Sequence, residues 1–423
     1  MKKFLTPVIA MLMVLLMGLM ACNSLGASPV TLRLMQYTAS GSQEETLKAM
    51  VDEFQRRNPN IKVKVEVVAF ADYFTKLNTA ISAGNGAPDV FELGYENFVT
   101  YAAKGVLRNM NDVISRDKSF KPEVFKKLAY DAFKYQNKQY GVPEGFSAVV
   151  MFYNKDLFDK AKVEYPNSSW TWKEELAAAQ KLTDTQNGIW GTYAPIQFWE
   201  FYKTIAQNGG SIWSADNKKV TINSKQNVEA FQWMLDKAKE YKVSPPLNDD
   251  TFSQPDADLN AFKAGKIAML RVGIWNFGRF ADAPFKWDIA LEPGNTRKAH
   301  HFFADALVVS KRTKNSDAAW KFLKFISSDP FVANLRIEKG WNVPALNDEK
   351  VMENYYKTTP PESKKVVLQA LDTLVLPPVG PIPEKWNDLT GIVGQELDKA
   401  RLGKIDAQTA LNNAQEKIEK LMK

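Results

Sequence analysis

Alternating apolar and polar positions define the first part of the chain. Residues 30–35 and 61–67 alternate and predict two strands, and residues 89–93 predict a third. Between them, apolar residues recur at helical spacing in 47–54 and 73–81, which predicts two helices that each bury one face. Strand, helix, strand, helix, strand with short connections implies a parallel sheet with right-handed crossovers.

The segment 141–158 divides the chain. Pro143 interrupts regular structure there, and the apolar run 149–153 is typical of a strand buried on both faces. We interpret this segment as the crossover between two α/β lobes. The polar stretch 292–301 predicts a second crossover, and 340–344 predicts a third passage near a cleft.

Further elements follow from the same patterns. Thr171 and Glu174 have the spacing of a capping box at a helix start. The patterns predict strands at 220–222 and 305–311 and helices at 173–182, 228–238, 317–326, 389–400 and 410–421.

The start of the chain has the pattern of a secretory signal. Two lysines precede an apolar run at 5–20 that is too short for a comfortable membrane span. Cys22 is the only cysteine, so no intramolecular disulfide forms. A lone thiol after a small residue at the end of such a run is an acceptor for lipidation. We expect 1–21 to be a signal peptide and 22–29 a lipidated tether at the outer face of a bacterial cell membrane, or in the periplasm.

Charge and histidine content exclude other classes of partner. The chain has 55 basic and 48 acidic residues, and two of the basic residues lie in the predicted signal. This mild excess is spread along the chain without a basic cluster rich in aromatics, which argues against a nucleic-acid partner. His300 and His301 are the only histidines and lack a cysteine nearby, so we interpret them as a linker pair and predict no metal site and no cofactor.

Several segments, in order along the chain, resemble the bacterial extracellular solute-binding proteins of family 1, the sugar-binding lipoproteins of ABC importers. They are Tyr153-Asn154-Lys155-Asp156-Leu157, the helix 173–182, Gly209-Gly210, 262–269 with Gly273-Ile274-Trp275, 318–325 and 402–411. The chain departs from the family at Glu144, where many members have a small or apolar residue.

The resemblance implies a periplasmic-binding-protein-like α/β fold of two discontinuous lobes, joined by a hinge, with the ligand cleft between them. We expect the N-terminal lobe to comprise 30–144 and 300–343, and the C-terminal lobe 145–292 and 344–423. Residues 293–299 are then the crossover linker.

Candidate ligand contacts come from topology and from the resemblance. In open α/β sheets ligands bind beyond the carboxyl ends of the strands, which points to the loops 36–41 and 94–97. The resemblance places a hydroxyl-accepting carboxylate at Glu96 and sugar-stacking aromatics elsewhere, since a flat aromatic covers the apolar face of a sugar ring. The complete predicted set is Trp275, Trp386, Trp199, Glu96, Tyr37, Ser40 and Trp341.

We therefore predict a monomeric substrate-binding component of an ABC importer. It captures a carbohydrate, expected to be an oligosaccharide, by lobe closure and delivers it to a membrane permease. One alternative keeps the fold but binds a phosphorylated polyol or acidic sugar through Arg271 or Arg279. Another class, an exported glycoside hydrolase, requires paired carboxylates across the scissile bond. The sequence shows no catalytic motif, and we predict no catalytic residue.

Overall fold

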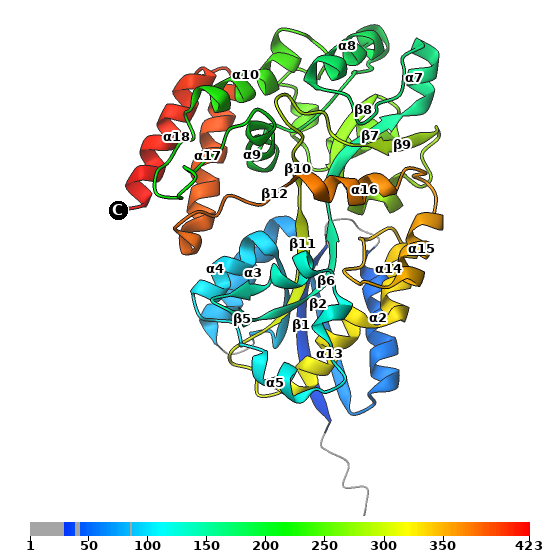
Figure 1. The fold of residues 1–423 in the computed structure, drawn as a ribbon, viewed down its shortest axis with the longest axis vertical. Coiled ribbons are helices and arrows are strands. Elements are labelled where there is room, and N and C mark those ends of the chain that lie inside the picture. Colours follow the sequence, from blue (N-terminus) through cyan, green and yellow to red (C-terminus); the bar gives the residue numbers. More distant parts are fainter. Residues whose placement is uncertain (1–28, 39–42, 85–86) are drawn as a thin grey trace, which may run out of the picture.

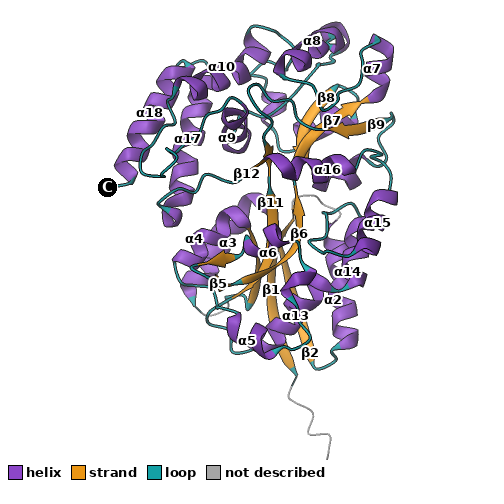
Figure 2. Cartoon of the chain, viewed as in Figure 1, coloured by secondary structure: helices purple, strands orange, loops and turns teal. Residues whose placement is uncertain are grey.

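The computed structural model describes residues 29–38, 43–84 and 87–423. The predicted signal peptide, Cys22 and Ser40 lie outside the described residues. Figure 1 shows two lobes stacked along the long axis, and each lobe contains its own sheet, as the colouring in Figure 2 makes clear. The predicted two-lobe α/β architecture is present.

The larger sheet has five strands in the order β2-β1-β3-β11-β6. Strand β1 pairs with β2 and β3 in parallel, and β11 pairs antiparallel with β3 and β6, so the predicted parallel arrangement of the first three strands is confirmed. We call this part of the molecule the large-sheet lobe. Its elements are β1 (Val30–Thr38), α2 (Gln43–Arg57), β2 (Ile61–Ala69), α3 (Phe70–Ala83), β3 (Val90–Gly94), α4 (Tyr95–Ala103), α5 (Asn111–Arg116), η1 (Pro122–Val124), α6 (Lys127–Asp131), β4 (Lys134–Tyr135), β5 (Lys138–Gln139), β6 (Gly141–Ser147), β11 (Phe303–Val309), α13 (Ser316–Ser328), α14 (Pro330–Glu338) and α15 (Glu349–Lys357).

Hydrogen bonds from one side chain of helix α3 join it to the neighbouring strands β1 and β3. The buried hydroxyl of Tyr73 donates to the carbonyl oxygens of Met35 on β1, at 3.1 Å, and of Glu92 on β3, at 2.8 Å. Both carbonyl groups lie in the carboxyl-terminal halves of their strands, so this hydroxyl ties α3 to the part of the sheet that leads to the ligand-binding edge.

Strand β6 corrects the expectation that Pro143 interrupts regular structure. Asp305 on β11 pairs with Gly145 and Ala306 pairs with Pro143, so Glu144 is an extra residue at a bulge. A proline is tolerated here because β6 is an edge strand and the ladder is already disrupted at the bulge.

The smaller sheet has the order β8-β7-β9, with β7 antiparallel to both neighbours. We call this part the small-sheet lobe. Its elements are β7 (Val149–Asn154), α7 (Lys155–Ala161), α8 (Trp172–Leu182), η2 (Thr185–Asn187), α9 (Phe198–Gln207), α10 (Lys225–Lys239), η3 (Asp250–Ser253), α11 (Ala257–Lys263), β8 (Met269–Gly273), η4 (Ile274–Asn276), α12 (Phe277–Phe280), β9 (Trp287–Ala290), α16 (Lys365–Ala370), η5 (Leu371–Thr373), η6 (Pro383–Lys385), α17 (Trp386–Arg401) and α18 (Ala407–Leu421).

The sequence patterns predict this lobe unevenly. Thr171 and Glu174 form the expected capping box at the start of α8. The expected strand at 220–222 is wrong, since its backbone contributes only a bridge between Val220 and Trp213. Val220 and Ile222 are buried, but no partner strand continues the pairing, so this segment is a loop and turn.

The chain crosses between the two sheets at Ala148, since β6 ends at Ser147 and β7 begins at Val149. The large sheet thus extends past residue 144, where the sequence places the lobe boundary; the complete set of lobe boundaries stays a prediction. At the return crossing, His300 and His301 form strand β10, which pairs in parallel with β12 (Leu374–Val375). Among the helices of the described residues, none combines the length and apolarity that a membrane span requires.

Candidate functional site

A cavity of about 460 Å³ lies between the two lobes, within the size range of small-molecule sites. The large-sheet lobe lines it with Tyr37, Gln43, Phe70, Glu92, Glu96, Ser147, Phe303, Asp305, Trp341 and Asn342, and the small-sheet lobe with Val149, Pro195, Gln197, Trp199, Glu200, Asp256, Asp258, Arg271, Val272, Gly273 and Trp275; His301 lies at the junction. Five of the predicted contacts, Tyr37, Glu96, Trp199, Trp275 and Trp341, are brought together here.

Three half-buried aromatic rings form one side of the cavity. The Phe303 ring at the start of β11 lies 5.9 Å from the Trp199 ring and 5.8 Å from the Trp275 ring, both edge to face. Gly273 places the Trp275 indole, because a Cβ atom at Gly273 lies 2.1 Å from ring carbons of Trp275. Only glycine lets this indole lie across the end of β8.

Trp386 does not line the cavity, which corrects the expectation that it stacks on a ligand. Its side chain is 1% exposed and belongs to the core between α9, α10, α17 and α18. The ring packs edge to face on Phe198, at 5.4 Å, and on Trp199, at 6.2 Å. Trp386 therefore packs against Trp199 in the core of the small-sheet lobe. Its indole contributes to packing and does not reach the cavity.

The opposite side of the cavity carries acidic groups from the large-sheet lobe. Tyr37 on β1 donates its hydroxyl proton to Oδ1 of Asp305 at 2.5 Å. Glu96, in the first turn of α4, accepts from Nδ2 of Asn97 at 3.1 Å, and its carboxylate folds back over Gly94, where a Cβ atom would lie 2.5 Å away. Tyr37 and Glu96 thus lie near the carboxyl ends of β1 and β3, where the sequence analysis predicts the ligand site.

Burial makes these carboxyl groups weak acids. Burial, reinforced by the negative charge of Asp305, raises the pKa of Glu96 to about 7. Burial likewise raises the pKa of Asp305 to about 6, although the Tyr37 hydrogen bond lowers it, and raises the pKa of Glu92 well above its usual range. These carboxyl groups therefore hold protons at higher pH than exposed carboxyl groups do.

Glu144, the departure from the family pattern, lies beside this acidic side. It forms a buried ion pair with Arg336 of α14, and the Arg336 guanidinium also lies 4.3 Å from the ring centre of Trp341. Oε1 of Glu144 and Oε2 of Glu92 have no hydrogen-bond partner among the described residues. The Arg336 guanidinium is thus the cation beside several buried carboxyl groups, among them Glu144 and Glu92.

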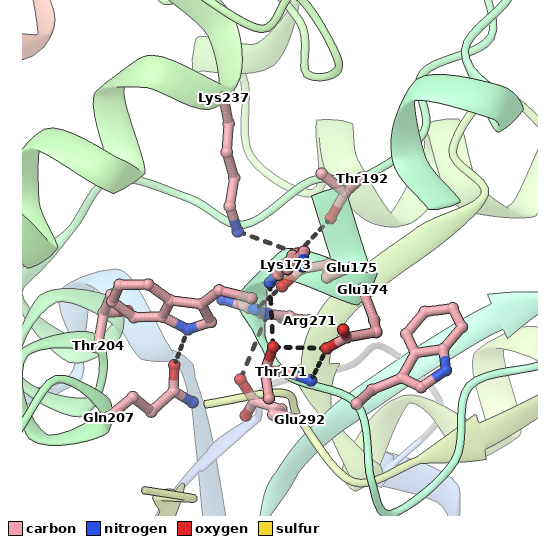
Figure 3. A network of polar contacts seen from close by, with 12 residues as sticks. Thr171, Lys173, Glu174, Glu175, Thr192, Thr204, Gln207, Lys237, Arg271 and Glu292 are labelled. Atoms are coloured by element: carbon pink, nitrogen blue, oxygen red, sulfur yellow. Dashed lines mark hydrogen bonds and ion pairs between the residues drawn. The ribbon is translucent and has the colours of Figure 1, made fainter. Parts of the chain in front are cut away.

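A second buried charge network lies behind the aromatic side, and Figure 3 shows part of it. It joins Arg271, Lys203, Lys237, Glu175, Glu200 and Glu292. Arg271 pairs with Glu175, and its Nη1 lies 3.3 Å from Glu200 and its Nε 3.5 Å from Glu292. Arg279 pairs with Asp256 at 2.7 Å. Both arginines that an anionic ligand would need are therefore already paired with carboxylates.

His301 is a cavity residue that the sequence interpretation missed. Its Nε2 lies 2.6 Å from the carbonyl oxygen of Trp199, which only accepts, so Nε2 carries the proton. Burial lowers the pKa of His301 to about 3, which keeps the ring neutral. Asp305 was missed as well, although an acid inside the apolar strand 303–309 is a usable signal. Among the described residues, no group of three or more histidine, cysteine or acidic side chains is arranged to hold a metal ion.

These features define a class of protein: a two-lobe α/β ligand-binding protein whose cleft is lined by aromatic rings and carboxyl groups. The sequence profile of the bacterial extracellular solute-binding proteins matches residues 40–332. The chain belongs to this family.

Individual relatives agree with that assignment. An ABC substrate-binding protein from Listeria monocytogenes, solved in complex with cycloalternan, is 46% identical, with a TM-score of 0.88 over 93% of this chain and 99% of the other. A solute-binding protein from Thermotoga lettingae, bound to α-D-tagatose, is 25% identical, with a TM-score of 0.82 over 93% of this chain and all of the other. The arabinooligosaccharide-binding protein of Bacillus subtilis is 26% identical over 77% of this chain and 76% of the relative.

Proposed function

We propose that this protein captures a neutral oligosaccharide between its lobes and delivers it to the permease of an ABC importer. The observation that carries the proposal is the composition of the cleft. Aromatic rings on one side cover the apolar faces of sugar rings, and Glu96 and Asp305 on the other side accept hydrogen bonds from hydroxyl groups. Closure of the lobes brings both sides onto one ligand.

The cleft disfavours an acidic sugar or a phosphorylated polyol. Among the described residues that line the cavity, Arg271 is the only lysine or arginine, and three carboxylates surround it. An anion would meet Glu92, Glu96 and Asp305 without a free cation to balance its charge. A neutral ligand avoids that repulsion and still donates hydrogen bonds.

The same geometry supports binding over hydrolysis. A glycoside hydrolase needs a carboxyl acid and a second carboxylate on opposite sides of the bond. Glu92, Glu96 and Asp305 lie on the large-sheet side. On the small-sheet side, Glu200 is paired with Lys203 at 2.7 Å, Asp256 is paired with Arg279 at 2.7 Å, and Asp258 accepts from the backbone N–H of Leu259 at 2.9 Å. We infer that the ligand leaves the cleft unchanged.

Export and anchoring complete the proposal. The lysine-flanked apolar run and Cys22 support a lipid-anchored protein at the outer face of the cell membrane, with residues 22–29 as the tether. We propose that the protein acts there as a monomer, since one chain supplies both sides of the cleft.

The test is a thermal-shift and calorimetric screen of the purified chain against cycloalternan, maltotriose, arabinotriose, tagatose and a sugar phosphate. A ligand that binds only the folded state raises Tm, and we expect the largest rise with a neutral oligosaccharide. Cycloalternan is the first candidate because a 46% identical relative was solved with it. A larger rise with the sugar phosphate, or release of shorter sugars during incubation, contradicts the proposal.

A further inference from the structure

A second concavity lies on the small-sheet lobe, outside the cleft. It has a volume of about 580 Å³, and none of the described residues that line it also lines the cleft. Its sides come from the start of α8, from α10 and from the start of α18, together with Asn208 and Asn295 of two loops. In Figure 1, α8 and α10 lie at the end of the lobe farthest from the large sheet. We call this concavity the outer groove.

Aromatic residues form the base of the outer groove. The rings of Trp172 and Trp233 stack with their centres 5.1 Å apart and their planes within 5°, and the Tyr241 ring lies 5.8 Å from Trp233. Trp172 is buried and donates from Nε1 to Gln207 at 3.1 Å, so it is held from within the lobe. Trp233 and Tyr241 are half-buried. Trp172 and the Lys237 ammonium, which lies 5.3 Å from the Trp233 ring centre, therefore pack against Trp233 beside the half-buried Tyr241.

The remaining groups around the groove are uncharged or acidic. Amide side chains and carboxyl groups surround the aromatic base: Asn208, Gln232, Asn295, Gln408, Glu229, Asp236 and Asp406. Several of them orient one another; Asn295 donates to Asn208 at 2.7 Å, and Gln232 donates to Asp236 at 2.7 Å. No lysine or arginine is among the described residues that line the groove.

This composition selects one class of occupant. With three carboxyl groups and no lysine or arginine among its described lining residues, the groove disfavours phosphate, nucleic acid and anionic polymers. Lys225, whose Nζ lies 3.8 Å from Glu229, offsets only one of these negative charges. Flat aromatic side chains cover the apolar face of a sugar ring. Amide side chains donate to and accept from its hydroxyl groups, and carboxylates accept from them. Aromatic rings and carboxyl groups, which we propose bind a neutral saccharide in the cleft, thus also line the outer groove.

We propose that the outer groove is a second binding site, for a neutral polysaccharide chain. It gives the protein a contact with polymeric carbohydrate, which a cleft of about 460 Å³ between two lobes does not enclose. The site is independent of the cleft and of the identity of the transported sugar, because the two share no lining residue.

Affinity electrophoresis in native gels that contain soluble starch, dextran or mannan tests this site. We expect at least one polymer to retard the wild-type chain, and Tyr241→Ala and Gln232→Ala to weaken the retardation at least about threefold, the loss of one aromatic or polar contact. The matched control is Tyr356→Ala on α15, another half-buried tyrosine, which leaves the retardation unchanged.

A cleft variant separates the two sites. Trp275→Ala removes an aromatic of the cleft, so it keeps the retardation if the polymer binds in the outer groove. The proposal is overturned if none of the three polymers retards the wild type, or if Trp275→Ala abolishes retardation while Tyr241→Ala preserves it. Because Tyr241 and Gln232 are partly exposed, an unchanged Tm in both variants confirms that a lost interaction is not lost folding.

Discussion

The two lobes bury charge in opposite ways. Behind the aromatic side of the cleft, three cations meet three carboxylates in a closed network: Arg271, Lys203, Lys237, Glu175, Glu200 and Glu292. On the acidic side, four carboxyl groups accompany one guanidinium: Glu92, Glu96, Glu144, Asp305 and Arg336. A balanced network fixes structure, whereas an acid-rich cluster keeps acceptors available for a ligand.

The pKa values reflect this difference. Although burial raises the pKa of Glu200, the charges of Lys203 and Arg271 outweigh it and lower the pKa to about 2. Burial prevails for Glu96 and Asp305, whose pKa values rise to about 7 and about 6. Glu175 and Glu200 therefore keep their charges near neutral pH, although burial raises the pKa of Glu292 and lowers the pKa of Lys237 to about 8. In the acidic cluster, the raised pKa values put the titration of Glu96 and Asp305 close to neutral pH.

The largest expected effect is the loss of stability when the balanced network loses a cation. Arg271→Met leaves Glu175, Glu200 and Glu292 with too little positive charge in a buried site, which costs about 3–5 kcal/mol. Thermal unfolding of the ligand-free protein measures it. Arg279→Met, whose partner Asp256 is half exposed, is the matched control and leaves Tm nearly unchanged. Equal Tm values for both variants would show that the network contributes no structure.

Two tryptophans separate packing from binding. Trp386→Ala empties a fully buried site in the small-sheet lobe and costs about 3–5 kcal/mol of stability. Trp275→Ala leaves Tm almost unchanged but weakens ligand binding severalfold, because an aromatic contact contributes about 0.5–1.5 kcal/mol beyond its buried area. Paired unfolding and calorimetric titrations distinguish the roles. Normal ligand binding by Trp275→Ala would refute the proposal that this indole stacks on the ligand.

These tryptophans also show how far the sequence predicts the molecule. Periodicity predicts the parallel β1–β3 core, because alternation and helical spacing report which face of each element is buried. A resemblance identifies Trp199 and Trp275 as cavity residues, but it does not reveal that Trp386 lies behind them, since burial depends on how α9 and α17 pack. Asp305 reaches the cavity through sheet pairing between distant segments, which local pattern does not encode.

The acidic cluster predicts a pH dependence with opposite signs for folding and binding. Raised folded-state pKa values mean that the stability this cluster contributes is present at acidic pH and lost as pH rises through about 6 to 7. Hydroxyl donors favour the charged carboxylates, so ligand binding releases protons, and affinity falls as pH falls through the same window, by at most about tenfold per pH unit and proton.

Calorimetry in two buffers of different ionisation enthalpy counts the protons released. Other polar groups also adjoin this cluster: Asn97, Tyr37, Glu144 and Arg336. The variant Glu96→Gln therefore tests whether Glu96 releases the protons. We expect that variant to bind with a flatter pH profile. An unchanged profile would assign the protons to another group, and identical heats in both buffers would refute the linkage.

The smallest expected effect concerns the Tyr37 hydroxyl, which donates a hydrogen bond to Asp305 on the acidic side of the cleft. Tyr37→Phe removes the donor to Asp305 without changing the ring contacts, and a hydrogen bond to a charged acceptor contributes about 1.5–3 kcal/mol at most. Because that bond lowers the pKa of Asp305, its loss raises this pKa further. Near neutral pH we therefore expect affinity to fall a few-fold and the pH profile to shift towards higher pH, while Tm in acid is preserved. A uniform loss of affinity at every pH would mean that Tyr37 contacts the ligand directly and does not act through Asp305.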